Sequence, residues 1–291
     1  MKRLIVLFTT VALGACGSDA GQGAPEAPAQ SALTGDASKV LSTWVAGNAA
    51  YGVFVPSDGP PRDEEGNRLP AVYSADMAQS LGENPLIEYL FLNLEPAWDA
   101  AAIEAMVEGL ARVPATDRPV LLVRTPVPDE TGLEATGAQI AEALAKGADG
   151  VVIPHIQTPE QASTVVGFFE SAGADVWSPQ NPDGKILAMI MIEDPSAVEV
   201  AAAIADTPGY SVLACGIGSL TGAIGGDRNA GEAGCMAVLA EGNRVGVYSM
   251  MTAMTPESVI DRIERGYLGI LSFPSDEYEA MVQAGRDAQG R

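Results

Sequence analysis

Short apolar runs alternate with longer helical patterns along most of this 291-residue chain, and this alternation constrains the fold more than any other feature. Eight runs are found, at residues 53–55, 87–94, 120–123, 150–153, 186–192, 211–215, 245–250 and 269–272. Most are nearly continuous in apolar residues, as in parallel strands covered on both faces. Strands that alternate with helices indicate βα units. Eight such units favour a closed (β/α)8 TIM barrel, an α/β fold, over an open doubly wound sheet.

The segments between these runs carry helix signals. Residues 99–110 and 133–144 place Ala, Ile, Met and Leu three and four positions apart, which is typical of amphipathic helices. Prolines are expected in the first turn of three other helices, at Pro159, Pro195 and Pro256. Glycines are expected to end four helices, at Gly147, Gly173, Gly242 and Gly266. Residues 57–68, rich in charge and proline, predict a loop near the barrel mouth.

The N-terminus has the features of an export signal. Lys2 and Arg3 give a basic start, and residues 4–13 are apolar but shorter than the roughly 20 residues of a membrane-spanning helix. The following LGAC, which ends at Cys16, resembles the bacterial lipobox. We therefore expect residues 1–15 to be a lipoprotein signal peptide and Cys16 to be lipidated. The alternative is an ordinary signal peptide that happens to contain a cysteine.

Two further regions follow the signal. Residues 16–36 are rich in Gly, Ala, Pro, Ser and Gln and predict a flexible tether, and residues 37–291 are expected to form the barrel. The formal net charge of −22 argues against nucleic acid as a partner. We expect an exported lipoprotein that faces the periplasm or the outside and contacts the membrane only through the lipid on Cys16.

Two cysteines remain in the expected barrel, Cys215 and Cys235. In an oxidising compartment they would be able to pair, but thiols in a chain with a large core are also often buried small hydrophobes. We slightly favour two unpaired thiols.

Several motifs in register point to a known family. The pieces that carry the resemblance are LVRTP at 122–126, residues 140–150, VVIPHIQTPEQA at 151–162, MIMIE at 189–193, GIGSL at 216–220 and residues 262–271. In order and spacing, the chain from about residue 86 to its end resembles the HpcH/HpaI aldolase and citrate lyase family. The resemblance implies a pyruvate-type TIM barrel, a carbon-carbon lyase activity on a small 2-keto acid, a divalent metal (Mg²⁺ or Mn²⁺) and a possible homo-oligomer.

The resemblance also assigns roles to individual residues. Arg124 matches the arginine that neutralises the developing enolate oxygen, and Glu193 matches the first metal carboxylate. The backbone amides of Gly216, Ile217 and Gly218 match the turn that receives the substrate carboxylate. Glu95 keeps the acid of the second strand, where we expect it to orient a water or an arginine.

Three positions depart from the family pattern. Ser219 stands in place of the second metal carboxylate, Met191 in place of a Gln, and Pro96 in place of the histidine base. One carboxylate offsets less of the charge of a dication than two, so we expect metal affinity to be weakened or lost. Two residues are candidates to restore the site: His155, the only histidine, as a base or ligand, and Asp227 as a second metal carboxylate.

Each of these residues also has a purely structural interpretation. Arg124 and Glu193 would form an ion pair that only stabilises the barrel, His155 would be a loop or capping residue, and Asp227 would lie in a solvated turn. The sequence therefore predicts a metal-dependent lyase with a degenerate site. The alternative is a non-catalytic, lipid-anchored barrel that binds a small anion or an envelope partner.

Overall fold

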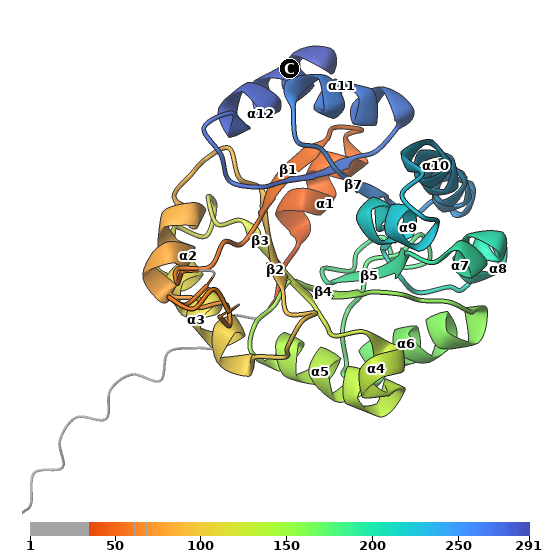
Figure 1. Cartoon of the computed structure of the whole chain (residues 1–291), viewed down its shortest axis with the longest axis horizontal. Helices are drawn as coiled ribbons and strands as arrows, with labels where there is room; N and C mark the ends of the chain where they lie inside the picture. The colour runs from red at the N-terminus through yellow and green to blue at the C-terminus, as the bar shows by residue number, and fades with distance from the viewer. Residues whose placement is uncertain (1–34, 61, 68) are drawn as a thin grey trace, which may run out of the picture. The chain divides into compact units, whose positions relative to one another are not determined.

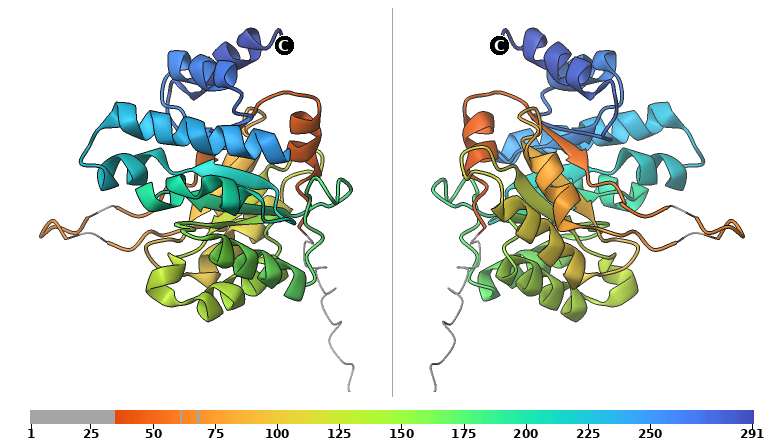
Figure 2. Two further views of the ribbon diagram at one scale, coloured as in Figure 1. Left: turned by 90° about the vertical axis from the view of Figure 1, so that its right-hand side faces the viewer. Right: turned by 90° about the vertical axis from the view of Figure 1, so that its left-hand side faces the viewer.

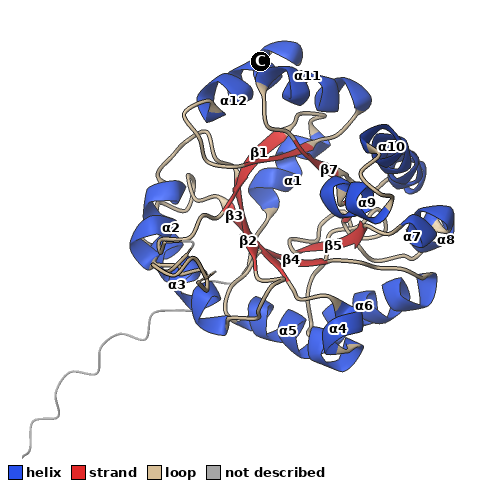
Figure 3. Cartoon of the chain, viewed as in Figure 1, coloured by secondary structure: helices blue, strands red, loops and turns tan. Residues whose placement is uncertain are grey.

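The apolar runs pair as parallel strands in the computed structural model, which describes residues 35–60, 62–67 and 69–291. The eight strands lie in the order β6-β5-β4-β3-β2-β1-β8-β7. A parallel bridge between Val212 in β6 and Tyr248, just before β7, brings the two ends of the sheet together. Figures 1 and 3 show the resulting ring of strands surrounded by helices. The predicted TIM barrel is confirmed as a nearly closed barrel.

The strands are β1 (Ala50–Phe54), β2 (Tyr89–Asn93), β3 (Val120–Arg124), β4 (Gly150–Ile153), β5 (Leu187–Ile192), β6 (Val212–Cys215), β7 (Met250–Thr252) and β8 (Gly269–Ser272). The helices of the described residues are α1 (Ser38–Val45), α2 (Ala75–Gly82), α3 (Ala100–Ala111), α4 (Pro128–Thr131), α5 (Leu133–Ala145), α6 (Pro159–Ser171), α7 (Pro195–Glu199), α8 (Ala201–Ala205), α9 (Ile217–Ala223), α10 (Arg228–Val245), α11 (Pro256–Arg265) and α12 (Tyr278–Ala288).

The prediction of a strand at residues 245–250 was wrong. Helix α10 continues past Gly242, where we expected its end, to Val245, and it stops at Gly246 in the left-handed conformation with φ of 80°. Gly242 packs closely on the following segment, since a β-carbon there would lie 3.0 Å from the Ser249 hydroxyl. The strand β7 therefore starts only at Met250, and the first strand also starts earlier than predicted, at Ala50.

The predicted helix starts agree with the structure. Pro159, Pro195 and Pro256 each occupy the first turn of a helix. Thr158 and Thr255 precede two of these prolines, and their hydroxyls accept hydrogen bonds from backbone N–H groups of the first turn. Such caps satisfy donors that have no partner within the helix.

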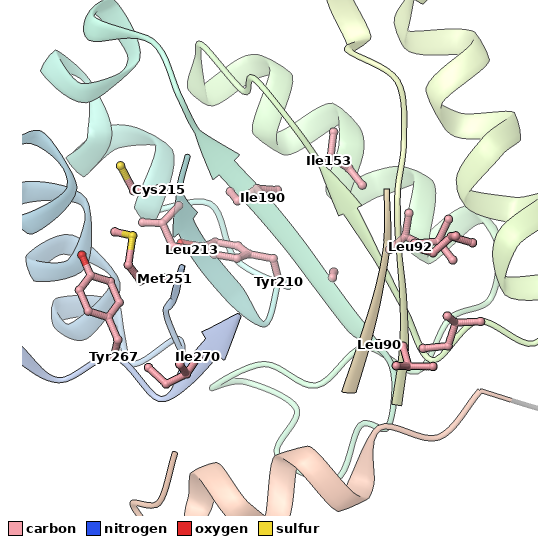
Figure 4. Packing of buried hydrophobic residues seen from close by; sticks show 14 of the residues in the cluster. Leu90, Leu92, Ile153, Ile190, Tyr210, Leu213, Cys215, Met251, Tyr267 and Ile270 are labelled. Atoms are coloured by element: carbon pink, nitrogen blue, oxygen red, sulfur yellow. The ribbon is translucent and has the colours of Figure 1, made fainter. Parts of the chain in front are cut away.

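Side chains of the strands alternate between two apolar clusters. One cluster fills the space between the strands and the surrounding helices, and Figure 4 shows members such as Leu92, Ile190 and Leu213 there. The other includes Phe91, Met189 and further residues of alternate strand positions, which face the barrel interior.

Helix α1 closes the N-terminal end of the barrel. Its buried residues, including Trp44, belong to the same cluster as the interior strand residues. The Trp44 indole N–H donates to the carbonyl oxygen of Leu268 at 2.8 Å, and its ring lies 4.9 Å from that of Tyr248. Access to the interior is thus left to the opposite end, where the strands terminate.

The connection between β1 and α2 contains the predicted loop. It leaves the carboxyl end of β1 and extends outward from the barrel, as Figure 2 shows. In the part of the chain that the structure describes, no helix is long and apolar enough to cross a membrane.

The expectation of two unpaired thiols was wrong, because Cys215 and Cys235 form a disulfide. Cys215 ends β6 and has the parity of the outward-facing residues, while Cys235 lies on the buried face of α10. The packing of this helix on that strand brings their α-carbons within 5.3 Å, a normal separation for a disulfide.

Candidate functional site

Two opposite charges meet at the mouth of the barrel. Arg124 is the last residue of β3, two positions after the interior residue Leu122, and Glu193 follows β5 with the parity of Met189. Because side chains alternate along a strand, both point inward from the carboxyl ends of their strands. The Nη2 atom of Arg124 lies 2.7 Å from Oε1 of Glu193, whose side chain is only 1% exposed. Burial of this carboxylate requires the arginine.

A third charged residue joins this pair. Nη2 of Arg124 also lies 2.7 Å from Oε1 of Glu95, which follows β2. The pKa of Glu95 is raised, mainly because the carboxyl group is buried. The Arg124 guanidinium acts in the opposite direction, and the Glu193 carboxylate adds to the increase. The Nε atom of Arg124 is buried without a hydrogen-bond partner. One guanidinium thus faces two carboxylates and retains an unused donor.

His155 approaches the same two carboxylates from the end of β4. Its Nδ1 lies 2.9 Å from Oδ2 of Asp194, and its Nε2 lies 3.7 Å from Glu95 and 3.8 Å from Glu193. Its φ of 50° makes it the one non-glycine residue with positive φ among the described residues. Such backbone strain is concentrated at functional sites.

The group formed by Glu95, His155 and Glu193 has the composition of a metal site. One ligand atom from each lies within 4.8 Å of the others. The distances of 3.7 and 3.8 Å from His155 Nε2 to the two carboxylates are too long for hydrogen bonds. The ring nitrogen and the carboxylate oxygens therefore converge without a hydrogen bond between them. Asp194 holds the second ring nitrogen, as carboxylates do for metal-ligating histidines. These residues fit a divalent cation.

Gly216 supports this group from the next strand. A β-carbon on Gly216 would collide with the carboxyl group of Glu193, so only glycine permits the approach. The N–H of Gly216 donates to the carbonyl of Ile192 at 3.1 Å. Of the three amides predicted to receive a substrate carboxylate, those of Ile217 and Gly218 remain, in the first turn of α9.

The structure separates the predicted metal residue Asp227 from the converging group. Asp227 is exposed and caps α10, accepting a hydrogen bond from the Ala230 N–H at 3.1 Å. Ser219 is exposed on α9 and borders the cavity described below. Among the described residues, Glu95 takes the place that Asp227 was expected to fill.

A cavity of about 470 Å³ opens beside the Arg124–Glu193 pair. Met191, which stands in place of the family's Gln, lies in its wall, and the wall is largely apolar. His155 and Glu95 are not part of the wall. Glu193 therefore belongs both to the candidate metal group and to the wall of an apolar chamber.

The expectation that Glu95 contacts an arginine is confirmed by its ion pair with Arg124. Two features were missed by the sequence reasoning. The place of Glu95 beside His155 was not anticipated. Asp194 was overlooked entirely, although its position directly after Glu193 at a strand end was a usable signal. The approach of separate strand ends could not be measured from spacing alone.

The comparisons with known proteins agree with this architecture. The sequence model of the HpcH/HpaI aldolase/citrate lyase family matches residues 85–263. No match is found among curated proteins.

Solved structures with the same fold include three relatives of this family. A HpcH/HpaI aldolase/citrate lyase family protein from Burkholderia cenocepacia J2315 is 21% identical, with a TM-score of 0.61 over 84% of this chain and 94% of that chain. The HpcH/HpaI aldolase from Desulfitobacterium hafniense DCB-2 is 19% identical, with a TM-score of 0.61 over 85% and 95%. The citrate lyase beta subunit complexed with oxaloacetate and magnesium from M. tuberculosis is 15% identical, with a TM-score of 0.54 over 82% and 97%. At these identities the likeness establishes the fold alone.

Proposed function

Because this chain belongs to the HpcH/HpaI aldolase/citrate lyase family, we propose that it is a carbon-carbon lyase that acts on a small 2-keto acid with a divalent cation. The observation that carries the proposal is the convergence of Glu95, His155 and Glu193 beside Arg124. A solved structure of the same fold, the citrate lyase beta subunit, is complexed with oxaloacetate and magnesium, which supports this class of ligand and metal.

The charge of the group supports a bound cation. Arg124 contributes one positive charge against the two carboxylates of Glu95 and Glu193, so an anionic substrate would meet a net negative group. A divalent cation would reverse that sign and would polarise the keto oxygen of the substrate as a Lewis acid.

Individual residues then have defined tasks. Glu95, His155 and Glu193 hold the cation, and Asp194 orients the His155 ring through Nδ1. We assign His155 to metal binding rather than to proton abstraction, since its free nitrogen faces the two carboxylates. Arg124, which lines the cavity, supplies positive charge near the place where negative charge develops on the substrate.

Titration of the purified protein with Mn²⁺ by calorimetry tests the metal site. We expect Glu95→Ala, His155→Ala and Glu193→Ala each to weaken Mn²⁺ binding by at least about tenfold. Asp227→Ala is the matched control, because this predicted metal carboxylate lies outside the converging group and caps α10. Equal losses in the Asp227 variant, or no Mn²⁺ binding by the wild type, would contradict the proposed ligands.

Turnover is tested separately, with pyruvate and oxaloacetate in the presence of Mn²⁺. We expect solvent-exchange of the pyruvate methyl protons or cleavage of oxaloacetate that is lost in Arg124→Ala. Metal binding without either reaction would favour the alternative of a non-catalytic barrel that binds a small anion. Pro96, which replaces the family's base, is the feature that favours this alternative.

We also propose that the protein is exported and anchored through a lipid on Cys16. Residues 1–34 lie outside the described residues, so the support comes from the basic start, the apolar stretch and the lipobox-like sequence. The Cys215–Cys235 disulfide adds support, since disulfides persist in oxidising compartments. Cys16→Ala should move the protein from the membrane to the soluble fraction of expressing cells, and retention in the membrane fraction would contradict the anchor.

A further inference from the structure

The cavity beside Arg124 lies within the barrel and continues to its mouth. Its wall includes residues of seven strands, β1, β2, β3, β5, β6, β7 and β8. Met254 and Phe273, just past the ends of β7 and β8, are 44% and 56% exposed and border the opening. A ligand thus has a path from solvent to the ion pair.

Small and flexible side chains create the space. TIM barrels normally fill their interior with layers of bulky branched residues. Here the corresponding upper positions include Ala214 in β6 and Gly216 just after that strand. Ala214 pairs with the unbranched Met191 of the neighbouring strand β5, and Met189 of β5 also lines the cavity. The volume of about 470 Å³ is within the range of pockets that hold a ligand larger than pyruvate.

Methionine dominates the wall. Five of the ten methionines of the chain line this one cavity, namely Met189, Met191, Met250, Met251 and Met254. Thioether side chains adapt their shape to apolar ligands and are frequent at binding surfaces that accept varied hydrophobic partners.

Three phenylalanines complete the apolar side. Phe54 stacks on Phe273 with ring centroids 4.8 Å apart and meets Phe91 edge-on at 5.2 Å. These rings link the interior residue Phe91 to the exposed Phe273 at the mouth, so the apolar wall is continuous along the depth of the cavity.

The polar groups are concentrated at one end and at the rim. Arg124 and Glu193 form one charged end, and Arg228 and Arg262 also line the wall. A three-carbon keto acid bound at this end would leave most of the chamber as water against apolar walls. Water fills about 30 Å³ per molecule in the liquid, so the empty cavity corresponds to on the order of fifteen waters, and most of them would remain beside apolar walls.

We propose that the substrate or ligand of this site is an amphiphilic 2-keto acid with an unbranched apolar chain of about five to eight carbons. The acid head lies at Arg124 and the metal group, and the chain lies among the methionines and phenylalanines. The position of the head rests on the proposed function, whereas the apolar subsite rests on the cavity itself. Each buried methylene contributes about a fourfold gain in affinity.

Calorimetry with a homologous series tests the subsite. The wild-type protein with saturating Mn²⁺ is titrated with pyruvate, 2-oxobutanoate, 2-oxohexanoate and 2-oxooctanoate. We expect the dissociation constant to fall by at least about thirtyfold from pyruvate to 2-oxooctanoate. A flat series, or no binding of 2-oxooctanoate at millimolar concentration, would overturn the proposal.

Two variants and a control test where the apolar chain of the ligand binds. Ala214→Leu fills the interior and should abolish the chain-length dependence while pyruvate binding is kept. Met191→Gln, at a partly exposed wall position, should weaken 2-oxooctanoate binding by about tenfold, whereas Met236→Gln makes the same exchange outside the cavity and should have no effect. Unchanged chain-length dependence in both wall variants would also overturn the proposal.

The outcomes separate this inference from the proposed activity. Chain-length-dependent binding without any turnover would retain the apolar subsite and reject the lyase. Turnover of all four keto acids of the series with the same KM would retain the lyase and reject the subsite.

Discussion

Arg124 at the end of β3 and Glu193 after β5 form an ion pair across the barrel mouth, with 2.7 Å between Nη2 and Oε1. The intervening strand β4 places His155 at the same end, beside the carboxylates. Arg124 therefore stabilises the buried Glu193 carboxylate, and both residues line the apolar cavity.

Removal of Arg124 should destabilise the fold. Arg124→Ala leaves the Glu193 carboxylate buried and without its main partner, which is expected to lower the free energy of unfolding by about 3 kcal/mol. The double variant Arg124→Met with Glu193→Met should lose much less, because no buried charge remains. Urea denaturation monitored by tryptophan fluorescence measures the loss of stability in each variant. A loss in the double variant equal to the sum of the losses in the two single variants would show that the two residues are not coupled.

Substitution of Gly216 should disturb the metal group without disturbing the fold elsewhere. In Gly216→Ala the new methyl group displaces the Glu193 carboxyl group, so Mn²⁺ affinity should fall by about tenfold or more. Gly218→Ala is the matched control, since a β-carbon there meets nothing within 4 Å. Equal Mn²⁺ affinity in the two variants would refute the close packing of Gly216 on Glu193.

The disulfide should contribute to stability through the loop that it closes. Cys215 and Cys235 are 20 residues apart, and a loop of this length corresponds to about 3 kcal/mol in the chain-entropy account. Addition of dithiothreitol should therefore lower the thermal midpoint of the wild type. The double variant Cys215→Ala with Cys235→Ala should show a low midpoint that the reductant does not change, and a wild type insensitive to full reduction would contradict the prediction.

Asp149 should make stability depend on pH. Desolvation raises its pKa from 3.8 to about 7, although the N–H groups of Leu121 and Asp36 donate to its carboxylate and act in the opposite direction. The protonated form is thus favoured in the fold, so the contribution is present below pH 4 and is lost as pH rises toward 7.

The comparison with Asp149→Asn isolates this effect. The free energy of unfolding of the wild type, relative to the variant, should decrease by about 2 kcal/mol between pH 4 and pH 7.5, with the shift discounted for partial exposure. Denaturant titrations at a series of pH values measure the difference. A constant or rising difference would mean that the backbone donors, rather than desolvation, control this carboxyl group.

The sequence pointed to the two central residues through the family resemblance. Arg124 and Glu193 were expected at the carboxyl ends of strands, and the structure adds that the period of two along each strand turns both side chains inward. The sequence pattern failed for the strand at 245–250, because Gly242 was interpreted as a helix end, although it packs close to Ser249 and the helix continues to Val245. A glycine required for close approach and a glycine required for positive φ look the same in a sequence.

The sequence by itself determined the barrel, the direction in which Arg124 and Glu193 point, and the loss of the family residues at Pro96, Met191 and Ser219. Only the tertiary structure decided that Glu95 and His155 join Glu193, that Asp227 caps a helix, that Cys215 pairs with Cys235, and that the interior retains an apolar cavity. The periodicity of apolar residues depends only on neighbours along the chain, so it can be identified from the sequence. Distances between the ends of different strands depend on the twist and packing of the whole barrel, and these emerge only when all the strands are in place.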